Sequence, residues 1–209
     1  GENAAPSFYR AIRDCNIFLE NIDQVPDMSE DERARWIAEV KFLKGYFHFW
    51  LIRMYGPIVL VDKNLDVDAG VTEVRQSRIP LDSCLNYVIG LFDEANANLP
   101  DVITNESSEL GRITKLINLS VKAYALTWGA SPLFNGNPDY ATLRNNDGAL
   151  LITQAADQQK WLRALAATQE AITFAHNQGV ALYEYEPGSL QAGISDTTRI
   201  QTSIRNVVA

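Results

Sequence analysis

The sequence contains few of the residues on which catalysis and metal binding usually depend. Among its 209 residues are two histidines and two cysteines. The cysteines, Cys15 and Cys84, form no C-x-x-C pair and belong to no Cys/His cluster with the spacing of a zinc site. We therefore predict no catalytic residue, no metal site and no cofactor. Because both cysteines lie on or beside apolar helical stripes, we expect two buried free thiols in preference to a disulfide.

Long apolar runs and an excess of positive charge are also missing. No stretch of about 18 apolar residues occurs, so no segment is expected to span a bilayer. Lysine and arginine number 18 against 26 acidic residues, for a formal charge of -8, which argues against a nucleic-acid partner. The chain opens on Gly1-Glu2 without an initiator methionine or a signal peptide. We interpret this as a processed chain whose targeting segment has been removed.

The sequence is rich in apolar residues that recur at alternating spacings of three and four, the pattern of amphipathic helices. Hydrophobic residues make up 46% of the chain, which is enough for a sizeable core. Five segments predict helices near residues 6–22, 29–55, 80–98, 114–130 and 158–178.

Local signals support several of these helices. Pro6 falls in the first turn of the first helix, where a proline costs no hydrogen bond. The second helix begins with the capping box Ser29-Glu30-Asp31-Glu32 and stops at Gly56-Pro57. Its buried stripe is assigned to Trp36, Val40, Leu43, Phe47, Trp50 and Met54. Phe42, Tyr46 and Phe49 add apolar surface on the flank, so this helix is expected to be buried on more than one side. The buried stripe of the fifth helix is assigned to Trp161, Leu165, Thr168, Ile172 and Ala175.

The lengths of the connections predict how the helices pair. Short connections join the first helix to the second and the third to the fourth, so each pair is expected to form an antiparallel hairpin. The fifth helix has no partner, and an apolar edge should be exposed there. The connections at about 56–79 and 131–157 are long enough to carry function or local structure. Residues from about 180 onward are predicted to be irregular, with Leu182, Tyr183 and Tyr185 compatible with a short strand.

Several blocks of sequence, in a fixed order, resemble one protein family. They are Tyr9–Asn16 with Leu19–Ile22, Ala38–Phe47 running to Arg53–Leu60, Arg78, Asn98–Pro100, Gly111–Lys115 and Ala130–Asn135. Together they are similar to the SusD/RagB family of nutrient-binding outer-membrane lipoproteins of Bacteroidetes, over about residues 7–185. One position departs from the family pattern, because Ile79 stands where a serine or threonine cap is more usual before the third helix.

The resemblance implies an all-α fold of tetratricopeptide-like helical hairpins with an irregular C-terminal segment. Residues 1–209 would form a single SusD-like domain that is incomplete at both ends relative to the family. The implied function is a surface glycan-binding or nutrient-binding subunit, lipid-anchored on the extracellular face of the outer membrane. The implied partners are a TonB-dependent SusC-like transporter and an oligosaccharide or other nutrient ligand, with membrane contact only through an anchor that this chain lacks.

The best candidates for ligand contact lie in the long connection after Phe134. Asn135, Asn137, Tyr140 and Arg144 place hydrogen-bonding groups beside an aromatic ring, which is the chemistry by which sugars are bound. Ligand residues vary within the family, so no site is carried over by motif. The run Asn145–Gly148 is also ordinary turn composition, and the alternative interpretation is a plain connecting loop.

Other candidate sites have simpler structural explanations. The acidic run Asp62–Asp68 imitates the oxygen spacing of a calcium loop, but Val67 stands where such a loop needs glycine. We therefore interpret it as a solvated loop. His48 and His176 lie in no catalytic motif, and packed or surface roles are expected for both.

Two other classes of function remain open at this stage. A tetratricopeptide-like adaptor that grips a partner peptide would use the same helical hairpins without binding a glycan. A glycan-cleaving enzyme would need two carboxylates facing each other across a cleft, and no motif proposes such a pair.

Overall fold

The computed structural model describes residues 7–186 and 193–208. The chain divides into two compact units, Gly1–Ile172 and Thr173–Ala209. Over the described residues there is no β-strand, and a single antiparallel bridge pairs Arg144 with Leu150. The fold is therefore all-α, as predicted, whereas a single domain over residues 1–209 stays a prediction.

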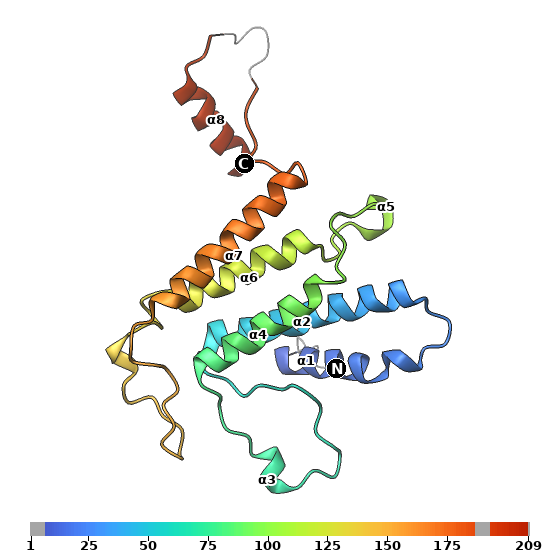
Figure 1. The fold of residues 1–209 in the computed structure, drawn as a ribbon, viewed down its shortest axis with the longest axis vertical. Coiled ribbons are helices and arrows are strands. Elements are labelled where there is room, and N and C mark those ends of the chain that lie inside the picture. The colour runs from blue at the N-terminus through green and yellow to red at the C-terminus, as the bar shows by residue number, and fades with distance from the viewer. Residues whose placement is uncertain (1–6, 187–192, 209) are drawn as a thin grey trace, which may run out of the picture. The chain divides into compact units, whose positions relative to one another are not determined.

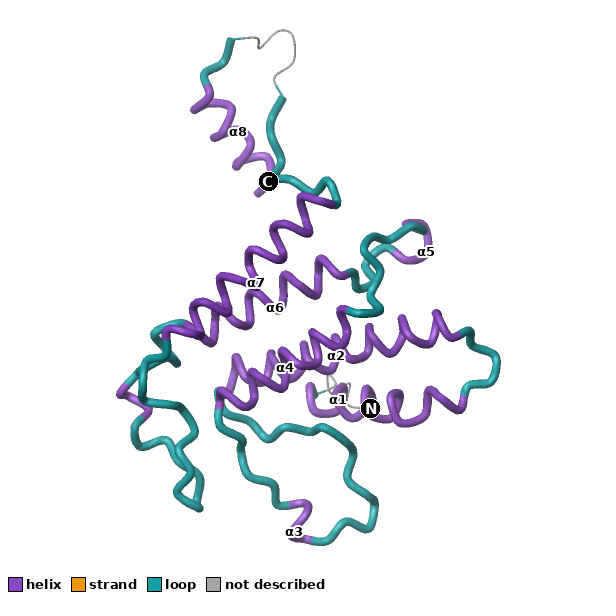
Figure 2. Tube along the Cα trace, viewed as in Figure 1, coloured by secondary structure: helices purple, strands orange, loops and turns teal. Residues whose placement is uncertain are grey.

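The five expected helices are all present, and their ends lie within about two residues of the prediction (Figures 1 and 2). They are α1 (Phe8–Asn21), α2 (Glu30–Tyr55), α4 (Leu81–Asn96), α6 (Lys115–Ala130) and α7 (Gln158–Asn177). Shorter helical turns are η1 (Ile22–Gln24), α3 (Val71–Val74), α5 (Glu106–Glu109) and η2 (Pro138–Tyr140).

Side-chain caps account for most of the helix starts. The hydroxyl groups of Ser7, Ser29 and Thr114 accept backbone N–H groups in the first turns of α1, α2 and α6. Pro6, predicted in the first turn of α1, lies outside the described residues. At α4 no side chain caps the helix, and the N–H of Leu81 instead donates to the carbonyl of Leu151 at 2.9 Å. The long connection before α7 thus replaces the cap that Ile79 cannot supply.

The predicted hairpins are confirmed, with α1 packed on α2 and α4 packed on α6. The two hairpins meet where α2 packs against α4 (Figure 1). Phe42 of α2 lies 5.5 Å from Phe92 of α4, centroid to centroid, at the centre of the core. A Cβ on Gly45 would come within 2.9 Å of the Phe92 ring, so glycine is needed for this close approach.

The stripe predicted for α2 was wrong at its two ends, whereas burial of the flank at Phe42 and Phe49 is confirmed. Trp36 and Met54 of the predicted stripe are 39% and 49% exposed. The fully buried face contains Phe42 and Phe49 of that flank together with Ala38, Gly45 and Ile52. Apolar residues surround most of this helix, so periodicity alone could not show which side would face α4.

The face predicted for α7 was also wrong. Trp161, Leu165 and Ile172 are 40%, 54% and 50% exposed. The buried residues are three alanines, Ala164, Ala167 and Ala171. Its small residues therefore face inward, and its large apolar side chains face outward. The prediction of an exposed apolar edge on this helix is confirmed.

The C-terminal stretch is more regular than expected. Asp196–Val208 forms α8, where the sequence was interpreted as irregular. Ile200 and Ile204 are its large exposed apolar residues, a stripe too thin to reveal a helical period. The strand considered around Tyr183 is not formed, since residues 180–186 contain no regular element.

Cys15 and Cys84 are buried free thiols, as predicted. No helix among the described residues is long and apolar enough to cross a membrane.

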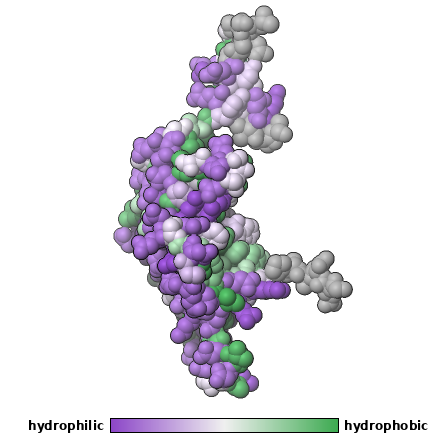
Figure 3. Space-filling view, turned by 90° about the vertical axis from the view of Figure 1, so that its right-hand side faces the viewer, coloured by the Kyte–Doolittle hydropathy of each residue, from purple (hydrophilic) through white to green (hydrophobic). Residues whose placement is uncertain are grey.

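The segment around α3 exposes Val67, Val71 and Val74. Hydrophobic surface gathers at the lower end of Figure 3, where α3 lies in Figure 1.

Candidate ligand-binding groove

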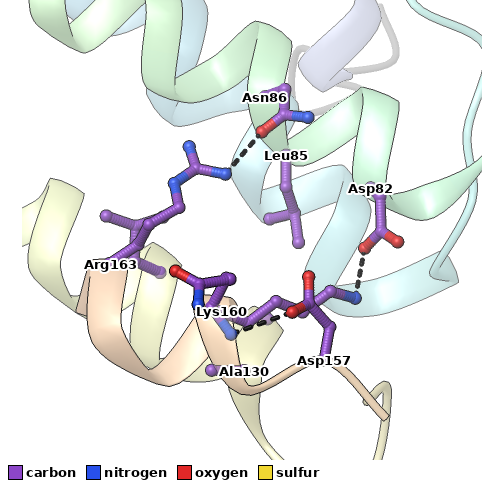
Figure 4. Close-up of a pocket in the computed structure, with 10 residues that line it drawn as sticks. Asp82, Leu85, Asn86, Ala130, Asp157, Lys160 and Arg163 are labelled. Carbon is purple, nitrogen blue, oxygen red and sulfur yellow. Dashed lines mark hydrogen bonds and ion pairs between the residues drawn. The ribbon is translucent and has the colours of Figure 1, made fainter. Parts of the chain in front are cut away.

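A cavity of about 230 Å³ opens between α4, α6 and the start of α7 (Figure 4). Its walls carry polar side chains from two helices that are far apart in sequence. Lys160 of α7 donates to the Asp82 carboxylate of α4 at 2.6 Å. One turn further along, the Arg163 guanidinium of α7 donates to the Asn86 side-chain oxygen at 3.0 Å. Each of the two polar pairs therefore joins α7 to α4 at the cavity.

The floor of the cavity is made of small and apolar residues. Gly129 and Ala130 of α6 line it together with Leu85 of α4. A Cβ added to Gly129 would lie 2.4 Å from Leu85 Cδ1, so any larger residue here would force the Leu85 side chain to move. The small residues Gly129 and Ala130 thus lie where α6 packs against α4 beneath the cavity.

A second cavity of about 250 Å³ continues along the same helices and shares Leu126 and Arg163 with the first. Lys122 lies in it, with its ammonium 2.7 Å from Asp93 and 3.5 Å from Glu170. Burial lowers the pKa of Lys122, but the hydrogen bond and charge of Asp93 and the charge of Glu170 outweigh burial, so its pKa is raised. We call the two cavities together the α4–α7 groove.

The connection before α7 holds one wall of this groove in place. Asn135 joins the two ends of the connection, because its amide nitrogen donates to the Asp157 carbonyl at 2.9 Å and its oxygen accepts the Asp157 N–H at 2.7 Å. Gly136 allows this closure, since a Cβ there would lie 2.8 Å from the Cβ of Ala156. The Asp157 carboxylate then accepts the N–H of Gln159 at 2.8 Å in the first turn of α7.

The other predicted ligand residues shape the connection itself. Asn137 accepts the N–H of Asp139 and donates to the Leu133 carbonyl. Arg144 donates to the Gly148 carbonyl at 2.9 Å. The ring of Tyr140 stacks on buried Phe134 with centroids 6.2 Å apart. Ligand binding by Asn135, Asn137, Tyr140 and Arg144 stays a prediction.

The groove residues Asp82, Asn86, Lys160 and Arg163 were not singled out from the sequence. Their signal is weak, because polar pairs spaced by three or four residues occur on the solvent side of most helices. Only the packing of α7 beside α4 brings the two pairs together.

A buried polar cluster elsewhere explains His48. Its Nε2 accepts the N–H of Val61 at 3.2 Å, so Nδ1 carries the proton and donates to the Lys44 carbonyl at 2.8 Å. Burial lowers the pKa of His48 to about 4, and the ring is neutral near pH 7. The neutral ring anchors the segment after α2, which is the packed role expected from the sequence.

The acidic run after α2 is tied into the same cluster. The Lys44 ammonium donates to the Asp62 carbonyl, and the Tyr87 hydroxyl donates to the Asp62 carboxylate at 2.8 Å. Asn64 donates through its side chain to the Arg13 carbonyl at 3.3 Å. Within the part of the chain that the structure describes, no three His, Cys, Asp or Glu side chains are grouped so that they could hold a metal ion.

Comparison with known proteins identifies the family. Residues 2–122, more than half of the chain, match a SusD-like family described as "Starch-binding associating with outer membrane". The chain belongs to this SusD-like family. The SusD-like protein P25 of Formosa agariphila is 28% identical over 116 residues, which are 55% of this chain and 21% of that protein.

Solved structures support the same assignment. The structure named BT4246 superposes with a TM-score of 0.77 and 32% identity, over 95% of this chain and 36% of that one. A laminarin binding SusD-like protein shares the fold with a TM-score of 0.52 and 23% identity, over 59% of this chain and 25% of that one. This chain therefore spans between 21% and 36% of the length of these three proteins.

Proposed function

We propose that this chain is the central helical part of a surface glycan-binding subunit of a SusC/SusD-type outer-membrane uptake system. The observation that carries the proposal is the match of more than half of the chain to a starch-binding family that associates with the outer membrane. A similarly folded protein is named as laminarin binding, which supports a glycan as the class of ligand. The polar pairs of the α4–α7 groove provide donors and acceptors that suit sugar hydroxyls.

The proposed position is the extracellular face of the outer membrane, reached through a lipid anchor outside this chain. A protein held there by lipid can capture a ligand but cannot conduct it inward. A TonB-dependent SusC-like barrel is therefore the proposed partner, with this protein closing over the outer mouth of the barrel. Such an interface would bury more than about 1,200 Å² in total, enough to survive mild detergent.

Two measurements on the full-length protein test this function. A binding screen against neutral and acidic glycans should find a ligand. Tagging the protein in its native cell, crosslinking and solubilising the membrane should recover a barrel protein. Glycan binding without a barrel would remove the uptake partner from the proposal, whereas a peptide ligand with neither glycan nor barrel would favour the tetratricopeptide-like adaptor.

The loop candidates are proposed ligand contacts and have their own test. Tyr140 is proposed to stack on a sugar ring with the face that does not contact Phe134. Tyr140→Ala should weaken glycan binding by the full-length protein about tenfold, whereas Tyr140→Phe keeps the ring and should weaken it much less. Thermal unfolding of both variants separates lost packing on Phe134 from lost ligand contact. Unchanged affinity in a folded Tyr140→Ala variant would contradict the proposal.

A further inference from the structure

The α4–α7 groove is long relative to a single sugar ring. Its polar side chains on α4 run from Asp82 to Asp93, which are roughly 16 Å apart along the helix axis at 1.5 Å rise per residue. On α7 they run from Lys160 to Glu170, over a similar length. The two cavities lie next to each other along these helices and share Leu126 and Arg163 in their linings. A linear ligand fits this shape better than a compact one.

The charges along the groove are nearly balanced. Lys160 lies against Asp82, and Lys122 lies between Asp93 and Glu170. Arg163 faces the neutral Asn86. The lining also includes Asp157, so four carboxylates stand against three cations.

The groove lining has a small excess of negative charge and the whole chain has a charge of -8, so binding of an anionic polymer is disfavoured. An acidic glycan, whether a uronate or a sulfate ester, would need an unpaired cationic strip. Two of the three cations already bind carboxylates, which leaves the groove with alternating donors and acceptors. Hydroxyl groups, which both donate and accept, match this alternation without adding charge.

We propose that the α4–α7 groove binds a neutral, linear glycan lying along α4 and α7, with its hydroxyl groups bonded to the polar side chains of both walls. This inference rests on the proposed glycan-binding function and adds a location and a chemical class. On the α4 wall Asp82 accepts hydrogen bonds, and Asn86 both accepts and donates them. On the α7 wall Lys160 and Arg163 donate them. Leu85, Gly129 and Ala130 form the apolar floor against the C–H face of the sugar.

A steric block tests the location without removing any polar group. Ala166 lines the second cavity and is exposed on α7, so Ala166→Trp places an indole in the groove. Gln169 is also exposed on α7 but lines neither cavity, so Gln169→Trp is the matched control. Calorimetry on the full-length protein would use maltohexaose, cellohexaose and laminarihexaose as neutral probes, and hexagalacturonate as the anionic probe.

The expected result is binding of at least one neutral hexasaccharide, weakened about tenfold or more by Ala166→Trp and unchanged by Gln169→Trp. Arg163→Ala should weaken binding of that hexasaccharide about tenfold, because a charged donor to hydroxyls is lost. Arg10→Ala, which removes another exposed arginine, should leave binding unchanged.

If a neutral glycan binds equally to wild type and Ala166→Trp, the groove is not the site, although the proposed function stands. Preference for hexagalacturonate overturns the neutral class. Wild-type protein that binds no glycan overturns the proposed function itself, and this inference with it.

Discussion

Two neighbouring aromatic residues of α2 contribute differently to stability. Phe49 is 1% exposed and meets the rings of Tyr124 and Trp128 edge-on at 5.7 and 6.0 Å. Trp50 is only half-buried, with the Arg53 guanidinium 4.4 Å from its ring centroid. A buried ring leaves a cavity when it is removed, whereas a surface ring loses only part of its buried area.

We therefore predict that Phe49→Ala lowers the free energy of unfolding by about 3–5 kcal/mol. Trp50→Ala should cost roughly 1–2 kcal/mol, from partial burial and one cation–π contact. The sequence interpretation, which placed Trp50 on the buried stripe, would have assigned it the larger value. Urea denaturation of both variants decides between these assignments, and equal losses would contradict the structure.

His48 makes stability depend on pH. Its pKa is lowered from 6.5 to about 4, chiefly by burial, opposed by its bond to the Lys44 carbonyl. The unfolded chain therefore binds more protons than the folded chain between these values, so stability falls as pH drops from about 6.5 to 4. The groups facing the ring are Lys44, the edge of Tyr87 and Asp62.

The predicted loss attributable to His48 is about 3 kcal/mol over this pH range. Denaturation of the wild type and of His48→Gln across pH 4–7 measures it as the difference between the two pH profiles, which removes the contribution of carboxylates. His176→Gln, at the exposed histidine, is the control and should follow the wild type. A His48→Gln profile parallel to the wild type would show that the ring is not held neutral.

A network of charged side chains holds the connection between α4 and α6, which contains α5, against α2. Arg112 binds Glu39 at 2.9 Å and Glu109 at 2.7 Å, and Arg35 binds Glu109 at 3.0 Å. The Arg112 guanidinium also lies 5.7 Å from the ring centroid of Trp36. Networks of this kind hold a segment more firmly than isolated surface pairs do.

Arg112→Ala should therefore loosen the connection between α4 and α6 without unfolding the helices. If the free energy of local opening of this connection falls by about 1 kcal/mol, its rate of proteolytic cleavage rises about fivefold. Mass spectrometry of a limited digest would locate the cuts within residues 97–114, and Arg10→Ala is the control. Cleavage at the wild-type rate would show that the network does not hold this segment.

The two faces of α7 predict opposite responses to polar substitution. Leu165 faces outward and Ala167 faces inward. Leu165→Gln should change the free energy of unfolding of this chain by no more than about 0.5 kcal/mol. Ala167→Gln should cost about 1–3 kcal/mol, because a polar amide is placed at a buried position on the inner face of the helix. Thermal or urea denaturation of the pair tests the orientation of α7, and the reverse order would mean that the helix is rotated.

For the whole molecule, we predict binding without hydrolysis. Glycoside cleavage needs one carboxyl as acid and a second as base or nucleophile. In the groove the Asp82 carboxylate accepts from Lys160 and Thr153, and the Asp157 carboxylate accepts from the start of α7, so both are engaged in structural bonds. Purified full-length protein should release no reducing ends from neutral polysaccharides. Release that is abolished by Asp82→Asn would contradict this.

The candidate site was only partly predictable. The connection after Phe134 stands out in the sequence because it is long, polar and aromatic, and Asn135 does reach the edge of the groove through Asp157. The groove walls could not be found in this way. Asp82 and Lys160 become partners only when α7 packs beside α4, and no local pattern records a contact between residues so far apart in the chain.

For α2 the sequence by itself determined where the helix begins and ends, because capping and chain reversal act within one turn. Ser29 caps α2, and Gly56 ends it with a φ of 71°, which only glycine adopts easily. For α2 and α7 only the tertiary structure decided which face is buried. Around α2 and α7 the sequence offers more than one apolar face. The buried face of α2 is the one that carries Gly45, which permits close packing on Phe92, and the buried face of α7 is the one that carries three alanines.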